Sequence, residues 1–576
     1  MSSGDVVTRV YGGFRGVDFR GEEINLARSP DSVNMWKDYK KTESIRTRPR
    51  TELVTSFDET IYGIFFYKAA DTEMMLVHSG TKLYKVVDDE KTVLYEDLRE
   101  HKSNAFVFNN LWFFKDGKHY LQYDGATIKA VEGYVPTTSI GGKPETVIDG
   151  KNEPASDGKT YEDVNMLSDW RKNSFLGTGG EFGIFVLDTQ NVEEESIEVY
   201  INDKKIDKSV YTVSKNGQTG KVVIIPAPPE PLTDGQDNVV IEFKKTISEG
   251  IRNRILNCTL LEVFDNRVFF SGNPEYPNMI WHSSLNDPTY CSDLDYYNEG
   301  LDTAEVKGMV AGNNALWVFK EPSQANTTVF YHTPTIDSEY GKIYPNTHSS
   351  ISTGCIGKAI NFNDDIVFFS DRGMEGISGD ITTEQVIAHR SSLVDRKLTA
   401  EKKYADMVLA EWEGYLLVVI DNKIYLADSR AIFTNEDHFE YEWFYWEFPE
   451  AITCVKVNKG ILYLSTEDGI YTLTDKESDV ESYWVTPKDK FKHPQYLKTT
   501  NKRGCVAEAT GDISVYAKTE KTSFELIGTY ENIADYFVSR IKRKKFKDIQ
   551  LKFFSKTRFS LETVTLECFI GGYMKR

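Results

Sequence analysis

Short apolar runs separated by polar turns recur along most of the chain. In each unit an apolar run leads into a turn, a second apolar run follows, and a further turn and a third run often come after it. Apolar runs of about four to eight residues between turn residues are typical of strands, so the pattern predicts a series of small antiparallel sheets. Seven units follow it, at residues 61–86, 104–125, 260–283, 306–333, 357–378, 406–429 and 452–475.

Most units place two turn-forming residues between their first two apolar runs. Asn, Asp and Gly tolerate the positive φ that a tight two-residue hairpin requires. We therefore expect hairpin turns at Asn109-Asn110, Asp265-Asn266, Asn313-Asn314, Asp364-Asp365, Glu413-Gly414 and Lys459-Gly460.

Repeated small sheets must bury their faces against one another. They can do so radially, as the blades of a propeller, or in pairs, as sandwiches. Repetition over most of the chain without an intervening amphipathic helix favours an all-β fold with a β-propeller of about six to eight blades. Two or three separate sandwiches remain the alternative. The best helix candidate lies around Leu393 to Leu409, where a blade connector would fit equally well.

Two segments depart from the repeat. Residues 139–169 are polar and Gly-rich, which is typical of a linker or a long loop, and residues 197–247 then alternate strand-like runs with turns, as in a small inserted β-sandwich. The repeats stop after Asp475, and the alternating remainder predicts a C-terminal β-sandwich. The expected organisation is an N-terminal segment with the first blades (1–138), a linker with the inserted sandwich (139–250), the remaining blades (251–475) and the terminal sandwich (476–576).

Composition restricts the function. The 576 residues carry a formal charge of −20, which argues against nucleic-acid binding over the whole surface. No apolar run approaches the roughly 20 residues that span a bilayer, and the first residues lack the order of a signal peptide, so we expect synthesis in the cytoplasm. The six cysteines are 33 or more residues apart, a spacing that favours buried free thiols over a zinc site.

The stretch "FFSGNPEYPNMIWHSSLNDPTYC" (269–291) crowds His282, Ser283, Ser284 and Asp287 together. Nucleophilic catalysis depends on geometry across a fold, and adjacent residues alone do not provide it. Three prolines in this stretch remove backbone donors and favour turns. We interpret it as a blade strand, a loop and a return strand, with His282 packed or hydrogen-bonded.

Two other patterns suggest ligands but have structural explanations. Glycines 177, 179, 180 and 183 superficially resemble a dinucleotide loop, yet the following "GIFVLD" continues as a strand. Asp293, Asp295, Glu299 and Asp302 could supply oxygens to Ca²⁺, but Asn298 stands where an EF-hand needs glycine, and we favour an acidic surface loop. We assign no catalytic, cofactor-binding or metal-ligating residue and expect no enzyme activity.

The chain resembles a family of tailed-phage virion proteins in segments that cover most of its length in the same order. That family opens with a segment similar to "YGGFRGVDFRG…ARSPDSVNMWKD…SIRTRPR", which leads into a β-propeller. Its central blades resemble "NRVFFSGNPEYPNMIWHSSLNDPTY" and "ALWVFKE". A module that recurs in phage tail proteins is similar to "VYINDKKIDKSVYTVSKNGQTGKVVIIPAPP", and the family's last sandwich is similar to "RKKFKDIQLKFFS…LETVTLECFIGGYMKR".

This resemblance implies a structural tail component, most like the hub or nozzle of a short-tailed phage. Such a protein would reside in the virion tail as a homo-oligomeric ring of six or so subunits around the DNA exit channel. Its partners would be the adaptor, portal-proximal proteins and tail fibres. Genomic DNA would pass without specific binding. A separate hypothesis for the excess acid is that carboxylates along this path repel phosphate, and the alternative is that the acidity only maintains solubility.

Two other functions stay open. A receptor- or glycan-binding propeller at the tail tip could use some of the 9 Trp and 32 Tyr as stacking platforms for sugars. A propeller glycoside hydrolase would need two positioned carboxylates. The turns "SDRGMEGIS" and "STEDGIYTL" only partly match the sialidase-type turn, because both lack its tryptophan.

One strongly basic run, "RIKRKKFK", stands out in this acidic chain. It could contact an acidic partner surface or DNA phosphate, or its lysines could simply protect an edge strand from pairing. Our hypothesis is that it docks onto a neighbouring subunit or an adaptor. The candidate contact residues are Arg540, Lys542, Arg543, Lys544, Lys545 and Lys547.

Overall fold

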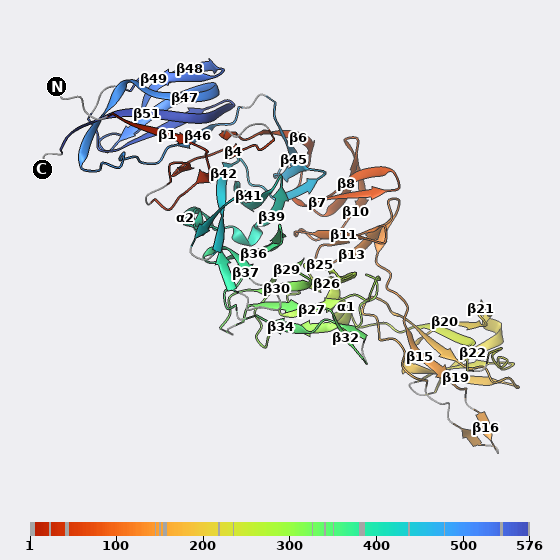
Figure 1. The fold of residues 1–576 in the computed structure, drawn as a ribbon. Coiled ribbons are helices and arrows are strands. Elements are labelled where there is room, and N and C mark those ends of the chain that lie inside the picture. The colour runs from red at the N-terminus through yellow and green to blue at the C-terminus, as the bar shows by residue number, and fades with distance from the viewer. Residues whose placement is uncertain are drawn as a thin grey trace.

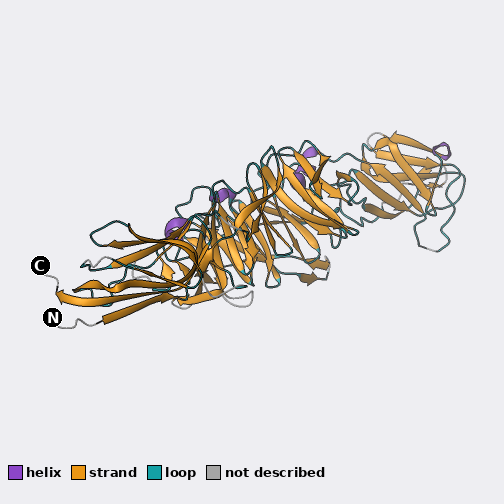
Figure 2. Cartoon of the chain, turned by 90° about the horizontal axis from the view of Figure 1, so that it is seen from above, coloured by secondary structure: helices purple, strands orange, loops and turns teal. Residues whose placement is uncertain are grey.

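The structure, a computed structural model, is almost entirely β, with 57% strand and 3% helix. It describes residues 6–21, 25–40, 45–144, 146–148, 151–153, 158–216, 219–233, 235–324, 327–338, 341–349, 351–378, 386–435, 438–476, 479–541 and 545–573. Three parts follow one another along an elongated molecule (Figures 1 and 2). A propeller lies in the middle, a sandwich that holds both chain ends lies at one end, and the inserted sandwich lies at the other.

Seven blades of four antiparallel strands form the propeller, six of them as separate sheets and blade 6 as part of a larger sheet. Blade 1 comprises β7 (Ile61–Ala69), β8 (Thr72–Ser79), β9 (Lys82–Val87) and β10 (Glu90–Tyr95). Blade 2 comprises β11 (Asn104–Phe108), β12 (Leu111–Lys115), β13 (Tyr120–Tyr123) and β14 (Ile128–Ala130). Blade 3 comprises β25 (Leu260–Phe264), β26 (Arg267–Ser271), β27 (Met279–His282) and β28 (Tyr296–Asn298). Blade 4 comprises β29 (Val306–Gly312), β30 (Ala315–Lys320), β31 (Val329–His332) and β34 (Asn346–His348), with the hairpin β32 (Thr335–Asp337) and β33 (Gly341–Ile343) between its last two strands.

The remaining blades follow the same order. Blade 5 comprises β35 (Ala359–Phe362), β36 (Asp365–Ser370), β37 (Gly373–Ser378) and β38 (Val386–His389). Blade 6 comprises β39 (Val408–Trp412), β40 (Tyr415–Ile420), β41 (Lys423–Asn435) and β42 (His438–Glu447). Blade 7 comprises β43 (Cys454–Asn458), β44 (Ile461–Ser465) and β45 (Gly469–Thr474), and β6 (Arg50–Ser56) from near the start of the chain supplies its fourth strand.

The first strands of the seven blades form a closed ring. Each contacts the first strand of the next blade, and β43 of blade 7 contacts β7 of blade 1. The ring encloses a central channel, as radial packing of blades requires. The predicted propeller is therefore confirmed, and each of the seven repeat units forms one blade.

The blade hairpins follow the expected turn chemistry. Positive φ values occur at both residues of five predicted pairs, for example 49° and 61° at Asn109 and Asn110. In blade 5 the prediction was wrong by one residue, because the positive φ values belong to Asn363 and Asp364, whereas Asp365 begins β36. The Asp365 carboxylate instead forms an ion pair with the buried Arg390 at 2.8 Å.

Helices serve only as connectors in the described part of the chain. The predicted helix region at Leu393 to Leu409 contains α2 (Asp395–Leu398) and the 3₁₀ turn η2 (Tyr404–Asp406), which join blades 5 and 6. An unpredicted helix, α1 (Glu249–Leu256), connects the inserted sandwich to blade 3. A further 3₁₀ turn, η1 (Lys208–Val210), lies inside that sandwich. Among the residues described, no helix is long and apolar enough to cross a membrane.

The inserted sandwich has two sheets that face each other across an apolar core. One sheet has the order β15 (Thr137–Gly142), β18 (Trp170–Phe175), β24 (Val239–Lys244), β20 (Glu193–Ile201) and β21 (Lys204–Lys205). The other has the order β19 (Gly183–Gln190), β23 (Thr219–Ile224) and β22 (Tyr211–Asn216). The core between them includes Phe185, Val222 and Ile241. The segment expected to be a linker supplies β15 and a separate hairpin, β16 (Thr146–Ile148) with β17 (Lys151–Glu153).

The C-terminal sandwich includes strands from both ends of the chain. Its C-terminal strands are β46 (Ser482–Val485), β47 (Tyr496–Thr519), β48 (Glu525–Ile533), β49 (Tyr536–Ser539), β50 (Ile549–Ser555) and β51 (Phe559–Tyr573). Strands β1 (Val6–Gly12) and β5 (Ile45–Thr47) pair with β51. Strand β4 (Met35–Lys37) pairs with β5 on one side and with β42 of blade 6 on the other, so blade 6 and the sandwich share one 13-stranded sheet.

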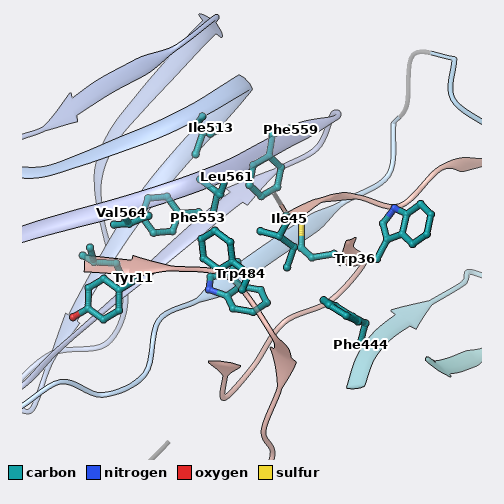
Figure 3. Close-up of a cluster of buried hydrophobic side chains, with 14 of the residues drawn as sticks. Tyr11, Trp36, Ile45, Phe444, Trp484, Ile513, Phe553, Phe559, Leu561 and Val564 are labelled. Carbon is teal, nitrogen blue, oxygen red and sulfur yellow. The ribbon is translucent and has the colours of Figure 1, made fainter. Parts of the chain in front are cut away.

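A single apolar core underlies this shared sheet (Figure 3). Trp36 and Phe444 from the propeller side and Phe553 and Leu561 from the sandwich side belong to one cluster, and Trp484 lies between Tyr11 and Phe444 in the close-up. Burial of each large apolar side chain contributes about 1.5–3 kcal/mol. The propeller and the C-terminal sandwich are therefore joined by packing as well as by the chain.

Candidate functional site: the mouth of the propeller channel

A cavity of about 550 Å³ opens where the first strands of the blades begin. We call it the channel mouth. All seven blades contribute to its lining, through residues 62–65, 101–104, 259–262, 307–309, 358–360, 407–409 and 454–456. The size lies within the range of roughly 300–1,000 Å³ that is typical of small-molecule sites.

The channel mouth is basic although the protein is acidic. Lys102, Lys307, Lys358 and Lys456 line it, and Glu262 is the sole carboxylate among the described lining residues. In the whole chain, by contrast, 88 Asp and Glu outnumber 68 Lys and Arg. The charge of the channel mouth is therefore the reverse of the charge of the chain.

Three of these lysines converge from different blades. Lys102 precedes blade 2, yet its ammonium donates a hydrogen bond to the carbonyl of Asp406, just before blade 6. Its side chain thus reaches across the channel mouth. Burial lowers the pKa of Lys358, the positive charges of Lys102 and Lys307 add to this, and the carboxylate of Glu305 opposes it. Burial also lowers the pKa of Lys102.

The lysines differ in how far their charge is compensated. Lys307 forms an ion pair with Glu305 at 2.6 Å. For Lys358 and Lys456, no carboxylate among the described residues lies within 4.0 Å of the ammonium. Lys456 reaches water inside the channel, but the surrounding protein still lowers its pKa. Burial raises the pKa of Glu262 to about 7, so this carboxyl group is partly neutral at neutral pH.

Sequence reasoning missed these lysines. Each stands at or just before the first strand of its blade, as in "KSNAFVF", "VKGMV", "GKAINF" and "CVKVN". Aligning the seven units on their first strands would have placed all four lysines near the channel axis. The pattern that defined the repeats was apolar, and it drew no attention to them.

The structure places the predicted basic run in the connection between β49 and β50. Arg540, Lys545 and Lys547 are exposed there, whereas Lys542, Arg543 and Lys544 lie outside the described residues. Phe546, between two of the lysines, is buried in the sandwich core and anchors the connection. The exposed side chains are available to a partner at the end of the molecule that holds both termini (Figure 1).

The crowded stretch at 269–291 has the structural role that the sequence suggested. His282 ends β27, is 3% exposed and packs among the rings of Phe269, Tyr297 and Tyr344. Its Nδ1 lies 2.9 Å from the carbonyl oxygen of Ser283, and burial lowers its pKa to about 4. The Ser283 hydroxyl accepts a hydrogen bond from the backbone N–H of Val268. These contacts stabilise the blade and do not assemble a nucleophile with a base.

The acidic segment at 293–302 lies at the surface in part, as we expected, but one of its carboxylates does not. Glu299 is fully buried, and its Oε1 lies 2.9 Å from Nε2 of the equally buried His332. Asp302 forms an ion pair with the buried Lys320, whose ammonium also donates to the carbonyl of Glu299. Glu299 and Asp302 therefore link blade 3 to blade 4, with a histidine and a lysine of blade 4 as their partners. No group of three metal-binding side chains occurs within the described residues.

A second cluster of ionisable groups surrounds His389 in blade 5. Its Nε2 lies 2.6 Å from Asp395 and its Nδ1 lies 3.1 Å from Glu375. Ser391 donates to the other oxygen of Asp395, so the group resembles a serine–histidine–carboxylate arrangement. Burial lowers the pKa of His389, but the hydrogen bonds to the two carboxylates outweigh it and raise the pKa to about 10. An imidazolium with both nitrogens donating cannot act as a general base.

This cluster predicts a pH-dependent contribution to stability. A histidine whose folded pKa is raised stabilises the fold fully below the unfolded pKa near 6.5, and that contribution disappears as the pH rises towards 10. In urea unfolding, we expect the stability difference between the wild type and His389→Gln to be about 1–3 kcal/mol larger at pH 6 than at pH 10. A difference that does not change with pH would contradict this assignment, and substitution of the exposed His348 is the control.

Comparisons with known proteins establish no family for this chain. No family model matches it, and no curated protein matches it. Among solved structures, BamB from Moraxella catarrhalis is similar at 11% identity and a TM-score of 0.33, over 74% of this chain and 97% of that one. A glycoside hydrolase is similar at 8% identity and a TM-score of 0.23, over 88% and 98% of the two chains. An exo-β-1,3-galactanase from Phanerochaete chrysosporium is similar at 8% identity and a TM-score of 0.19, over 82% and 96%.

Proposed function

We propose that the protein is a structural component of a bacteriophage tail, a hub or nozzle subunit that forms an oligomeric ring around the DNA exit channel. One observation carries the proposal. The opening segment, which bears the resemblance to phage virion proteins, is also the segment that joins the propeller to the C-terminal sandwich. A mechanical role requires such a junction, because a subunit that holds a channel open must not bend between its parts.

The residues of the opening motif are positioned by this junction. Gly16 (φ 108°) begins the two-residue strand β2 (Gly16–Val17) and lies so close to the carbonyl of Trp443 in blade 6 that a Cβ atom would collide with it. In the paired strand β3 (Arg28–Ser29), Ser29 donates to the carbonyl of Val485 in the sandwich. Asn34 accepts hydrogen bonds from Arg48 and from the backbone of Glu447. The motif thus contacts the propeller and the sandwich together.

In this role the two ends of the subunit would face different neighbours. The C-terminal sandwich, with its exposed basic residues, would contact an adjacent subunit or the adaptor. The inserted sandwich, at the opposite end of the molecule, would contact distal tail parts (Figure 1). The net charge of −20 would keep DNA from adhering along its path. No catalytic step and no cofactor form part of the proposal.

Electron microscopy of the purified protein, alone and mixed with assembled tails, tests the proposal. We expect closed rings of six or so subunits with a central hole, because a head-to-tail interface closes into a ring when its rotation permits. A persistent monomer that decorates only the tail tip would contradict the ring and would favour the receptor-binding alternative.

The basic run gives a second, independent test. We expect combined substitution of Arg540, Lys545 and Lys547 by glutamate to abolish or strongly reduce ring formation, because attraction to an acidic partner surface becomes repulsion. Gel filtration and electron microscopy measure the assembly, and circular dichroism should show an unchanged fold. The matched control reverses Lys204, Lys205 and Lys208 on the inserted sandwich. Normal assembly of the first variant would refute the docking role of the run.

A further inference from the structure

The lysines of the channel mouth have no role in the proposed tail function. They point into a cavity inside a single subunit, which is separate from the DNA channel that a ring of subunits would enclose. Lys102, Lys307 and Lys358 come from three different blades and meet at one end of the propeller channel. Bringing like charges together inside a protein destabilises it unless something compensates them.

Compensation from the protein itself is incomplete. Lys307 has Glu305 at 2.6 Å and Glu321 at 4.0 Å as partners, and the ammonium of Lys102 donates to a neutral carbonyl. No carboxylate in the described part of the chain lies within 4.0 Å of the Lys358 ammonium. A chain with an excess of 20 acidic residues has many carboxylates to spare, yet among the described residues only Glu262 contributes one to this lining. Glu305, which already pairs with Lys307, also acts on Lys358, and an anionic ligand would supply the further negative charge.

We propose that the channel mouth binds a small multivalent phosphate, held by Lys102, Lys307 and Lys358. Ammonium groups on flexible stems bind phosphate oxygens as point charges, and three of them match an anion with several negative charges. The cavity has room for a phosphorylated small molecule. The His101 ring and the Asn104 side chain also line it, with one nitrogen of each engaged with the Lys102 and Thr259 carbonyls, and the lysines supply the positive charge. The proposal does not depend on the tail function.

Lys358 is the most informative residue to change. Replacing it by methionine removes the ammonium for which the described residues supply no carboxylate and keeps an unbranched side chain of similar length. Without ligand, the variant should unfold at the same temperature as the wild type or a higher one, because a partly buried charge that is repelled by two other lysines is gone. A loss of binding in this variant could then not be attributed to a loss of folding. Lys204→Met on the inserted sandwich removes the same charge far from the channel and is the matched control.

The experiment is calorimetric titration of the full chain with inorganic pyrophosphate at low and at moderate salt. We expect saturable binding with one site per chain, weakened about tenfold or more by Lys358→Met and unchanged by Lys204→Met. Pyrophosphate should raise the unfolding temperature of the wild type and of Lys204→Met but not that of Lys358→Met. No saturable binding, or equal affinity of wild type and Lys358→Met, would show an adventitious ion only and would overturn the proposal.

A second arm identifies the source of the phosphate. A short single-stranded DNA is titrated under the same conditions. If the DNA binds in a Lys358-dependent manner and pyrophosphate does not, the site recognises a nucleic-acid backbone and the small-ligand proposal is wrong. Pyrophosphate binding that the DNA cannot displace would support the small ligand. Ring formation in the absence of pyrophosphate binding would refute this inference and leave the tail proposal intact.

Discussion

Replacing Arg28 by methionine is expected to destabilise the junction between the propeller and the C-terminal sandwich by about 3–5 kcal/mol. Arg28 is 7% exposed, and its guanidinium donates two hydrogen bonds, of 2.8 and 2.7 Å, to the carboxylate of Glu442. Glu442 lies on the last strand of blade 6 and is fully buried. The substitution leaves this carboxylate nearly uncompensated, since the other nearby cation, Arg15, is half exposed and 3.7 Å away.

Urea unfolding followed by tryptophan fluorescence measures this effect, because Trp443 and Trp484 are buried near the junction. The double variant Arg28→Met with Glu442→Gln should recover part of the loss, since no buried charge then remains unpaired. Lys129→Met is the control, because both members of its ion pair with Glu132 are exposed and the pair should contribute at most about 1 kcal/mol. A loss below 1 kcal/mol for Arg28→Met would show that the buried pair does not stabilise the junction.

Removing the first 56 residues is expected to prevent the propeller from closing. The chain would then lack β6, which pairs with β45 along its whole length and completes blade 7. Strand β45 would then become the unpaired outer edge of blade 7, and such an edge is prone to aggregation. The same truncation removes β1, β4 and β5 from the shared sheet. We expect loss of the cooperative unfolding transition and insoluble protein.

Adding the missing segment as a separate peptide tests whether the loss of these strands, and not a general folding defect, makes the truncated chain insoluble. A peptide of residues 6–56, added during refolding, should restore soluble protein, because it supplies every strand that the truncation removed. A chain that begins at Val6 keeps all described strands and is the control. If the chain without residues 1–56 folds with wild-type stability, β6 does not close the ring in the way that its pairing indicates.

Local patterns explain which features were predictable. Strand positions and hairpin turns depend on neighbouring residues, so alternating apolar runs and pairs such as Asn109-Asn110 identified the seven blades correctly. The six cysteines, expected as free thiols from their spacing, are all buried and unpaired. The packed role of His282 followed from its position after Trp281 in the expected return strand. In blade 5, Asp365 begins β36 and forms an ion pair with Arg390, so it does not occupy the predicted turn position. The local sequence does not reveal this contact.

The candidate site was predictable only in part. The basic run was visible because its charges are consecutive in the sequence, and Arg540, Lys545 and Lys547 are indeed exposed. The channel-mouth lysines are more than 350 positions apart at their extremes, and each is a single charge at the start of an apolar strand. Their convergence depends on the radial arrangement of the blades. Glu299 shows the opposite case. Its acidic segment was expected at the surface, but its own carboxylate is fully buried beside His332 of the next blade.

The sequence by itself determined the strand-rich character, the seven repeat units and the two sandwich modules, because these follow from apolar periodicity and turn chemistry within short windows. Only the tertiary structure decided which strands pair across the chain. Strand β6 joins β45 more than 400 residues away, and β1 joins β51 at the other end of the chain. Apolar patterns show that a strand has a face to bury, but they do not specify which open edge it will pair with. That choice, and with it the channel mouth, depends on how all the sheets pack together.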